Sequence, residues 1–387
     1  MSHADQDRYT LAGPDEIERR IACDQRRVCD EVASLLPAER ISALVLAGGY
    51  GRGEGGYRRS GPVMVPYNDY DYFLVVNGVS AAARKDLDIA LHGTAERLGR
   101  EFGLEVDFAV LESERLARLP VCLMYSELKW RHRVLLGDPR ALDAVQSPPP
   151  ADLPLAEFSR MMLNRGALLL MNARELEEGA VRARSSERFL RYFSKGMLAA
   201  GDARLAAAGR YHPLVAERGR RLRGIDWIGT GRERFLDLYE HATHIKLGGD
   251  SGGVLRPGEP QRLQRLAVHE WLDAFRALEA ARLGTAPESW QAYAAPSVSK
   301  GQGSRRWWSP AHHLALAFRS RAGRRTGLNL SRVWRHPRER LMAALPLLLE
   351  PGTHGPNRLA AEALGAPGDA AWHGLAEFFL EDWRRYC

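Results

Sequence analysis

Two carboxylates one residue apart, downstream of a glycine-rich turn, are the residues of this sequence whose types and spacing could do chemistry. An apolar run over 43–47 leads into Gly48 and Gly49, and a second apolar run opens with Asp69 and Asp71. Alternate residues of a strand point to one face, so we expect the two carboxylates to project side by side. Adjacent like charges are unfavourable unless a cation lies between them or one is protonated. Because glycine turns expose backbone N–H groups suited to phosphate, we favour the cation, and the pattern predicts metal-assisted phosphoryl or nucleotidyl transfer.

A third carboxylate is required if two metal ions are to be held. Asp107 is the candidate, on an alternating strand between apolar Val106 and Phe108. A neighbouring strand can bring this carboxylate onto the face of the first two, and Glu105 points the same way as a reserve. A solvent-facing strand acid is the alternative interpretation of Asp107.

The elements that must position these acids follow from local patterns. We expect a helix over 14–36, strands over 43–47, 70–76, 104–111 and 133–136, and a helix over 81–102. Ser80 is a good N-cap for the second helix, and Gly103 closes it. Strand, helix and strand in succession predict a crossover unit of a mixed sheet.

The composition changes at the proline-rich stretch 147–154, which predicts a linker between domains. Beyond it nearly every periodic segment is helical. We expect helices over 155–178, 186–208, 232–247, 260–283, 312–321, 337–348 and 369–383. The predicted fold class is α+β, with a mixed-sheet core over 1–146 and an all-α region over 155–387, which a break near 248–260 could divide in two.

The bulk composition is that of an ordinary globular protein, with 45% hydrophobic and 27% charged residues. The net charge of +7 comes from arginine, since the chain has only five lysines; it favours acidic ligands such as nucleoside triphosphates or RNA, with a solvated arginine-rich exterior as the alternative. No apolar run approaches the roughly 20 residues that span a bilayer, the N-terminus lacks an apolar signal core, and the four cysteines lack metal-ligand spacing. We therefore expect no membrane association and a cytoplasmic location.

The motif order resembles that of the polymerase-beta-type nucleotidyltransferase superfamily. In that order an apolar strand, a Gly-Gly turn, a variable loop, an Asp-apolar-Asp strand, a helix and a third acid follow one another; the residues here are Gly48, Gly49, Asp69, Asp71 and Asp107. The glycine loop is also similar to that of the nitrogen-regulatory uridylyltransferases. The resemblance covers residues 41–140, and its combination of motifs is specific where a lone glycine loop would not be.

The sequence departs from the family pattern in two ways. Residues 57–67 form an insertion before the acids, which we interpret either as a short hairpin or as a surface loop. Nothing like the phosphohydrolase or small-ligand regulatory domains of the uridylyltransferases follows. A regulator-modifying enzyme of that full type is therefore not expected.

The resemblance implies roles for individual residues. Gly48 and Gly49 would let the backbone approach the triphosphate. The three acids would bind two Mg²⁺ ions, or Mn²⁺, with Asp107 on the ion that activates the acceptor hydroxyl. Arg52 is a candidate phosphate contact, and Lys195 of the helical region could neutralise the departing pyrophosphate; a structural role is the alternative for both.

Two neighbours of these candidates receive weaker assignments. We interpret Glu54 as a residue that hydrogen-bonds the glycine loop into shape. Lys246 could act as proposed for Lys195, with a weaker claim. Histidine and tryptophan residues are interpreted as core or surface residues.

The implied function is transfer of a nucleoside monophosphate from a nucleoside triphosphate to an acceptor hydroxyl, with release of pyrophosphate, in a cleft between the core and the helical region. A small-molecule acceptor is favoured because the helical region resembles those of antibiotic-type nucleotidyltransferases. An RNA 3′ end or a protein side chain is the alternative acceptor. A non-catalytic nucleotide-binding or RNA-binding regulator is the non-enzymatic alternative, against which the complete set of three acids argues.

Overall fold

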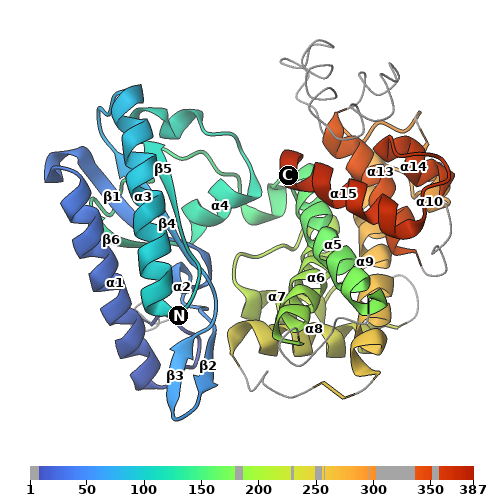
Figure 1. Ribbon diagram of the computed structural model, residues 1–387, viewed down its shortest axis with the longest axis horizontal. Coiled ribbons are helices and arrows are strands. Elements are labelled where there is room, and N and C mark those ends of the chain that lie inside the picture. Colours follow the sequence, from blue (N-terminus) through green and yellow to red (C-terminus); the bar gives the residue numbers. More distant parts are fainter. Residues whose placement is uncertain are drawn as a thin grey trace. The chain divides into compact units, whose positions relative to one another are not determined.

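The chain divides into two compact units, each of which is described by itself. The computed structural model describes residues 8–178, 186–227, 231–248, 255–256, 258–295, 297–301, 336–350 and 357–387. The first unit comprises Met1–Leu153, Tyr211–Arg220 and Thr243–Gly252, and the remainder forms the second. The first holds a mixed sheet and the second is helical, so the fold is α+β (Figure 1). The division at Leu153 falls in the predicted linker, but the two later segments of the first unit are not captured by a division there alone.

Four strands form the sheet of the first unit, in the order β5-β4-β1-β6. They are β1 (Ile41–Leu46), β4 (Tyr70–Val76), β5 (Val106–Glu112) and β6 (Arg133–Gly137). β4 and β5 are parallel, whereas β1 is antiparallel to both β4 and β6. The parallel pair requires a crossover, which α3 (Ala81–Phe102) provides between the Ser80 cap and left-handed Gly103 at φ 75°. The four predicted strands and the crossover helix are confirmed.

Both faces of this sheet are covered. Helices α1 (Asp15–Leu35) and α3 pack on the face that carries Tyr70 and Tyr72. The 3-10 helix η3 (Ser113–Arg118) and helix α4 (Leu123–Trp130) pack on the face that carries Phe73 and Val75. Because side chains alternate along a strand, Asp71 belongs to the second of these faces.

Two tyrosines of β4 bind polar residues of α1 inside the first core. The Tyr70 hydroxyl donates to Asp24 Oδ2 at 2.9 Å, and the Tyr72 hydroxyl donates to Gln25 Oε1 at 2.8 Å. Burial raises the pKa of Asp24, and this effect outweighs the lowering by the Tyr70 hydrogen bond and by Arg20. The start of β4, where the candidate acids lie, is thereby tied to α1.

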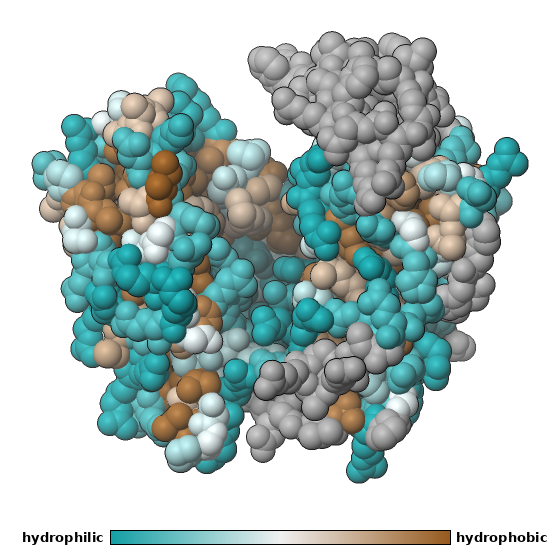
Figure 2. Space-filling view, viewed as in Figure 1, coloured by the Kyte–Doolittle hydropathy of each residue, from teal (hydrophilic) through white to brown (hydrophobic). Residues whose placement is uncertain are grey.

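The insertion over 57–67 contains a β-hairpin. Strands β2 (Tyr57–Ser60) and β3 (Val63–Pro66) pair antiparallel and turn at Gly61, whose φ of 60° suits glycine. The side chain of Val63 is 47% exposed. Figure 2 shows hydrophobic atoms on the lower left of the molecule, where Figure 1 places the tip of this hairpin. Of the two interpretations of the insertion, the hairpin is confirmed.

Helices make up the second unit. They include α5 (Leu155–Glu177), α6 (Ser186–Ala207), α9 (Glu259–Leu283), α10 (Trp290–Ala294), α13 (Pro337–Leu349), α14 (Arg358–Leu364) and α15 (Trp372–Tyr386), while α7 (Val215–Leu222) and α8 (Arg232–Leu247) have residues in both units. The predicted long helices are confirmed to within a few residues, and the helix expected over 312–321 lies outside the described residues. The described part of the chain contains no helix with the length and apolar character needed to cross a bilayer.

The raised pKa of Asp24 makes a prediction about stability. Ionised Asp24 costs stability. This cost is absent below the unfolded carboxyl pKa of about 3.9, grows as the pH rises from there to the raised folded-state pKa, and is constant above it. We expect Asp24→Asn, whose amide oxygen can still accept from Tyr70, to melt at a higher temperature than the wild type at neutral pH. Thermal unfolding across the acid range should show this advantage shrinking towards about pH 4. The control is Asp30→Asn, on the exposed face of the same helix, and equal pH profiles for the two variants would contradict the prediction.

Candidate active site

The glycine loop begins against the carboxylate of Asp71. The Ala47 N–H, just after β1, donates to the carbonyl oxygen of Asp71 at 2.8 Å. Gly48 follows with φ 61°, and a Cβ atom there would lie 2.3 Å from Asp71 Oδ2. No side chain fits at this position without displacing the carboxylate. Gly48 is the first residue of the short helical turn α2 (Gly48–Gly51). It therefore lies directly against Asp71, the second acid of the predicted pair.

Asp107 lies beside Asp71 on the neighbouring strand. The parallel register of β4 and β5 pairs Asp71 directly with Asp107. Paired residues of adjacent strands lie on the same face at the strand spacing of about 4.8 Å. Asp71 is half-buried and Asp107 is exposed. The two carboxylates therefore lie side by side, with Asp71 next to the beginning of the glycine loop and Asp107 one strand further from it.

Asp69 precedes β4 by one residue and is half-buried. The N–H of the following Tyr70 donates to the Glu105 carbonyl at 2.9 Å, so the chain at Asp69 already runs beside the start of the third predicted strand. Carboxylate oxygens are the ligands that Mg²⁺ prefers, and Asp71 and Asp107 offer ligands of this kind on paired positions of neighbouring strands. Among the described residues no group of three His, Cys, Asp or Glu side chains is arranged to hold a metal ion. Joint coordination by all three acids stays a prediction.

Tyr50 organises the loop between Gly48 and the acids. Its buried hydroxyl donates to the Gly56 carbonyl at 2.6 Å and accepts the N–H groups of Tyr67 at 3.1 Å and Asn68 at 3.3 Å. Burial raises the pKa of Tyr50 well above its ordinary value, so the hydroxyl remains protonated and able to donate. One side chain thus satisfies three backbone groups on both sides of the hairpin and fixes the segment that leads into Asp69.

Arg52 is held by two carboxylates of the same unit. Its side chain is 9% exposed and lies 3.9 Å from Glu54 Oε2 and 3.5 Å from Glu127 Oε2. The buried carboxylate of Glu54 accepts the N–H groups of Val215 at 2.9 Å and Ala216 at 3.1 Å, at the start of α7. Glu54 therefore binds a distant segment with its side chain, and only its backbone N–H, which donates to Gly49 at 2.8 Å, shapes the glycine loop.

Glu127 forms ion pairs with two arginines, Arg52 and Arg218. Arg218 Nη2 lies 2.7 Å from Glu127 Oε1, to which the Tyr211 hydroxyl also donates. Burial alone would raise the pKa of Glu127, but Arg52, Arg218 and the Tyr211 hydrogen bond together hold this pKa below its ordinary value. The carboxylate is ionised at neutral pH and anchors the Tyr211–Arg220 segment to the first unit.

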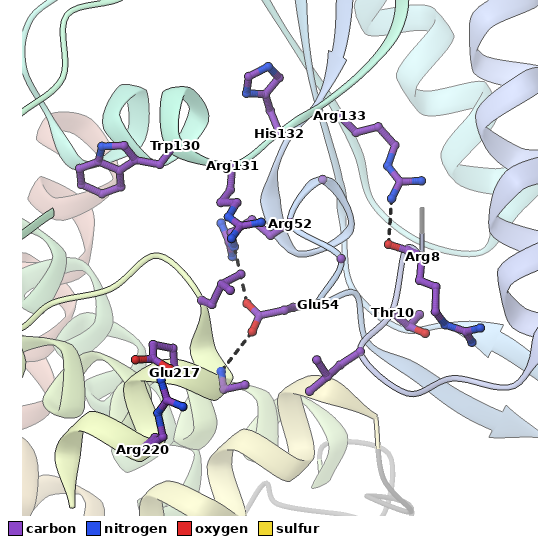
Figure 3. Close-up of a pocket in the computed structure, with 15 residues that line it drawn as sticks. Arg8, Thr10, Arg52, Glu54, Trp130, Arg131, His132, Arg133, Glu217 and Arg220 are labelled. Carbon is purple, nitrogen blue, oxygen red and sulfur yellow. Dashed lines mark hydrogen bonds and ion pairs between the residues drawn. The ribbon is translucent and has the colours of Figure 1, made fainter. Parts of the chain in front are cut away.

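A pocket of about 860 Å³ opens beside the second half of the glycine loop (Figure 3). All of its lining residues belong to the first unit. They are Arg8, Thr10, Leu11, Gly51, Arg52, Gly53, Glu54, Trp130, Arg131, His132, Arg133, Leu214, Ala216, Glu217 and Arg220. Five of them are arginines, and Asp69, Asp71 and Asp107 are not among them.

The structure places the two candidate lysines in different units. Lys195 is half-buried on α6 in the second unit, while the three acids and Gly48 lie in the first. Lys246, near the end of α8, belongs to the first unit, and its carbonyl oxygen accepts from Asn68 Nδ2 at 3.2 Å. A role for Lys195 in binding the nucleotide stays a prediction. Lys246 belongs to the segment whose backbone contacts Asn68, the residue before Asp69.

Several residues that shape the site were not singled out from the sequence. Tyr50 had a usable signal, because it is the one aromatic residue within the glycine run 48–56 and a ring there must be buried. Glu127, Tyr211 and Arg218 gave no such signal in the sequence. Glu127 lies 75 positions from its partner Arg52 and 84 positions from its partner Tyr211. The sequence alone does not distinguish Arg131 from the many other arginines of the chain.

Comparisons with known proteins leave the site to be interpreted from its own geometry. No family model matches the chain, no curated protein matches it, and no solved structure matches it. The assignment of function therefore rests on the residues described above.

The close approach at Gly48 predicts the behaviour of an alanine variant. Gly48→Ala places a methyl group against the Asp71 carboxylate and adds the strain of a positive φ. Gly61→Ala is the matched control, since Gly61 has φ 60° in open space. We expect urea unfolding to show Gly48→Ala as less stable than Gly61→Ala by about 1–3 kcal/mol, the usual cost of overpacking. Equal unfolding midpoints would contradict the close approach.

The lowered pKa of Glu127 predicts a loss of stability in acid. A lowered folded-state pKa gives stability that is present above the unfolded value of about 4.3 and is lost as the pH falls through the folded value. We expect Glu127→Gln to reduce the free energy of unfolding at neutral pH by about 1–3 kcal/mol, since Arg52 and Arg218 lose their counter-charge. The difference from the wild type should shrink in acid. Exposed Glu39→Gln serves as the control, and a Glu127 variant as stable as that control would refute the role.

Proposed function

We propose that the chain transfers a nucleoside monophosphate from a nucleoside triphosphate to an acceptor hydroxyl, releasing pyrophosphate. The observation that supports this most strongly is the backbone of Gly48 in contact with Asp71, which is paired in register with Asp107. In the proposal, the glycine turn that would bind phosphate adjoins Asp71, and Asp107 is the neighbour of Asp71 on the next strand. Their combination, rather than either alone, is what nucleotidyl transfer requires.

Each part of this arrangement has a distinct task in the proposal. At Gly48 the space that a Cβ atom would fill is taken by the Asp71 carboxylate, so in the proposal the glycine loop would meet the phosphates with its backbone N–H groups. Asp71 and Asp107, joined by Asp69, would hold two Mg²⁺ or Mn²⁺ ions. When bound, those ions would supply Lewis-acid stabilisation of the attacking oxygen and of the leaving pyrophosphate. Tyr50 and Glu54 keep the loop in place, so its donors are oriented before the substrate arrives.

The acceptor is proposed to be a small molecule. The pocket beside the loop has a volume of about 860 Å³, which falls within the range of about 300–1,000 Å³ typical of small-ligand sites. An RNA 3′ end or a protein side chain would need an extended surface rather than such a pocket. The reaction would take place in the cytoplasm, where triphosphates are supplied and the four free cysteines stay reduced.

The experiment that tests the function follows the label from each nucleotide. The protein is incubated with each of the four α-labelled triphosphates, Mg²⁺ and an extract of the host cell. Label in a small-molecule fraction supports the proposal, and its absence from every acceptor fraction with all four triphosphates refutes it. Label in RNA or protein keeps nucleotidyl transfer but replaces the acceptor.

Removing one charge from the carboxylate pair should abolish turnover. We expect Asp71→Asn to reduce pyrophosphate release by at least about 100-fold, since charge stabilisation in the transition state is lost. Circular dichroism and the melting temperature should remain close to those of the wild type. Asp86→Asn, an exposed acid on α3, is the control and should retain full activity. Unchanged turnover in Asp71→Asn would contradict the proposed function.

A further inference from the structure

The glycine loop has a second side, away from the acids. Since β1 lies between β4 and β6 in the sheet, the loop that leaves β1 has Asp71 on its β4 side. On its other side, a Cβ at Gly51 would lie 2.2 Å from the Leu46 carbonyl oxygen and 3.7 Å from the Cα of His132, just before β6. The pocket is bounded by this second half of the loop and by residues 130–133. The pocket thus borders the same loop as the carboxylate pair, although none of the three acids lines it.

The charge of this pocket is positive. Five arginines face two glutamates in its lining, and burial lowers the pKa of His132, so that histidine stays neutral and the arginines carry the charge. Arg8 lies 3.4 Å from Asp15, and Arg220 pairs with Glu217. The positive charges of Arg8 and Arg220 are therefore balanced by neighbouring acids.

Two other arginines retain unused donors. Arg52 comes from the glycine loop and Arg131 from the segment before β6, and both line the pocket (Figure 3). The Nε atom of Arg52 is buried and lies 3.9 Å from Glu54 Oε2, within ion-pair distance but without a hydrogen bond in the described part of the chain. No described residue forms a hydrogen bond or an ion pair with the Arg131 guanidinium. A buried guanidinium donor without an acceptor is costly, and an oxyanion satisfies it best.

We propose that this pocket binds a small molecule carrying a phosphate or carboxylate group, and that this anion is the acceptor of the proposed nucleotidyl transfer. The acceptor assignment rests on the proposed function; the anion site itself does not. Arg131 and Arg52 bind the oxyanion, and the indole of Trp130 supplies an adjacent apolar surface for the rest of the molecule. A cationic acceptor is excluded by the same charges.

Binding is tested by calorimetric titration of the full chain at low salt, without triphosphate or metal. The probes are glucose 6-phosphate for the phosphate group, citrate for the carboxylate group and glucose as the neutral match. We expect glucose 6-phosphate or citrate to bind and glucose not to bind. Arg131→Ala should weaken that binding by about 10-fold or more, the effect of losing a charged hydrogen bond, whereas Arg100→Ala, an exposed arginine on α3, should not.

The remaining outcomes overturn the proposal. Equal binding in Arg131→Ala and Arg100→Ala, or no binding of either anion, removes the pocket as an oxyanion site. Displacement of the bound probe by metal-free ATP assigns the pocket to the triphosphate, and Arg131-dependent binding of an RNA oligomer alone assigns it to a polynucleotide.

The two proposals fail in different ways. Unchanged turnover in Asp71→Asn refutes the transfer reaction and leaves an Arg131-dependent anion site in place. Loss of the anion site leaves the transfer reaction in place with another acceptor.

Discussion

The geometry of the candidate site depends on the absence of a side chain at residue 48. Gly48 adopts a positive φ, and the space that a Cβ would fill is occupied by the carboxylate of Asp71. The adjacent Ala47 N–H is bound to the Asp71 carbonyl, so the end of β1 is joined directly to the acid-bearing part of β4. Because Asp107 is paired with Asp71 in a parallel ladder, its position follows from the same contact. A turn that began one residue later would separate the loop from both acids.

Local sequence patterns predicted this part of the structure well. The alternation over Tyr70–Val76 placed one set of side chains against α1 and α3 and put Asp71 on the opposite face. Ser80 and Gly103 marked the ends of the crossover helix, and a strand-helix-strand unit implies a parallel pair. Short-range signals thus predicted that Asp107 would lie on the same face as Asp71, whereas the register that pairs the two residues is given by the structure.

The polar contacts around the loop could not be predicted in the same way. Glu54 binds the N–H groups of residues 215 and 216, more than 160 positions away, and Glu127 binds Arg218. Such contacts form only because segments distant in the sequence fold into the first unit. Hydrophobic periodicity within a segment does not indicate which distant residues it will contact. Tyr50 shows the same limit, because its hydroxyl joins backbone groups that the hairpin separates in sequence. The hairpin over 57–66 is thus held at its base by Tyr50 of the glycine loop.

Buried Glu54 and half-buried Glu127 also determine which arginines are left for a ligand. Glu54 and Glu127 lie within ion-pair distance of Arg52 and hold its guanidinium at the wall of the pocket, yet its Nε remains without an acceptor. A buried arginine restrained by carboxylates keeps its orientation at little further cost in side-chain entropy when an anion arrives. Arg131 has no such restraint among the described residues and supplies uncompensated charge. The restrained guanidinium of Arg52 would orient the bound anion, and the unrestrained guanidinium of Arg131 would attract it. The acids on the far side of the loop would repel the same anion. The loop would therefore separate a cation-binding side from an anion-binding side, which orients a charged acceptor before any reaction begins.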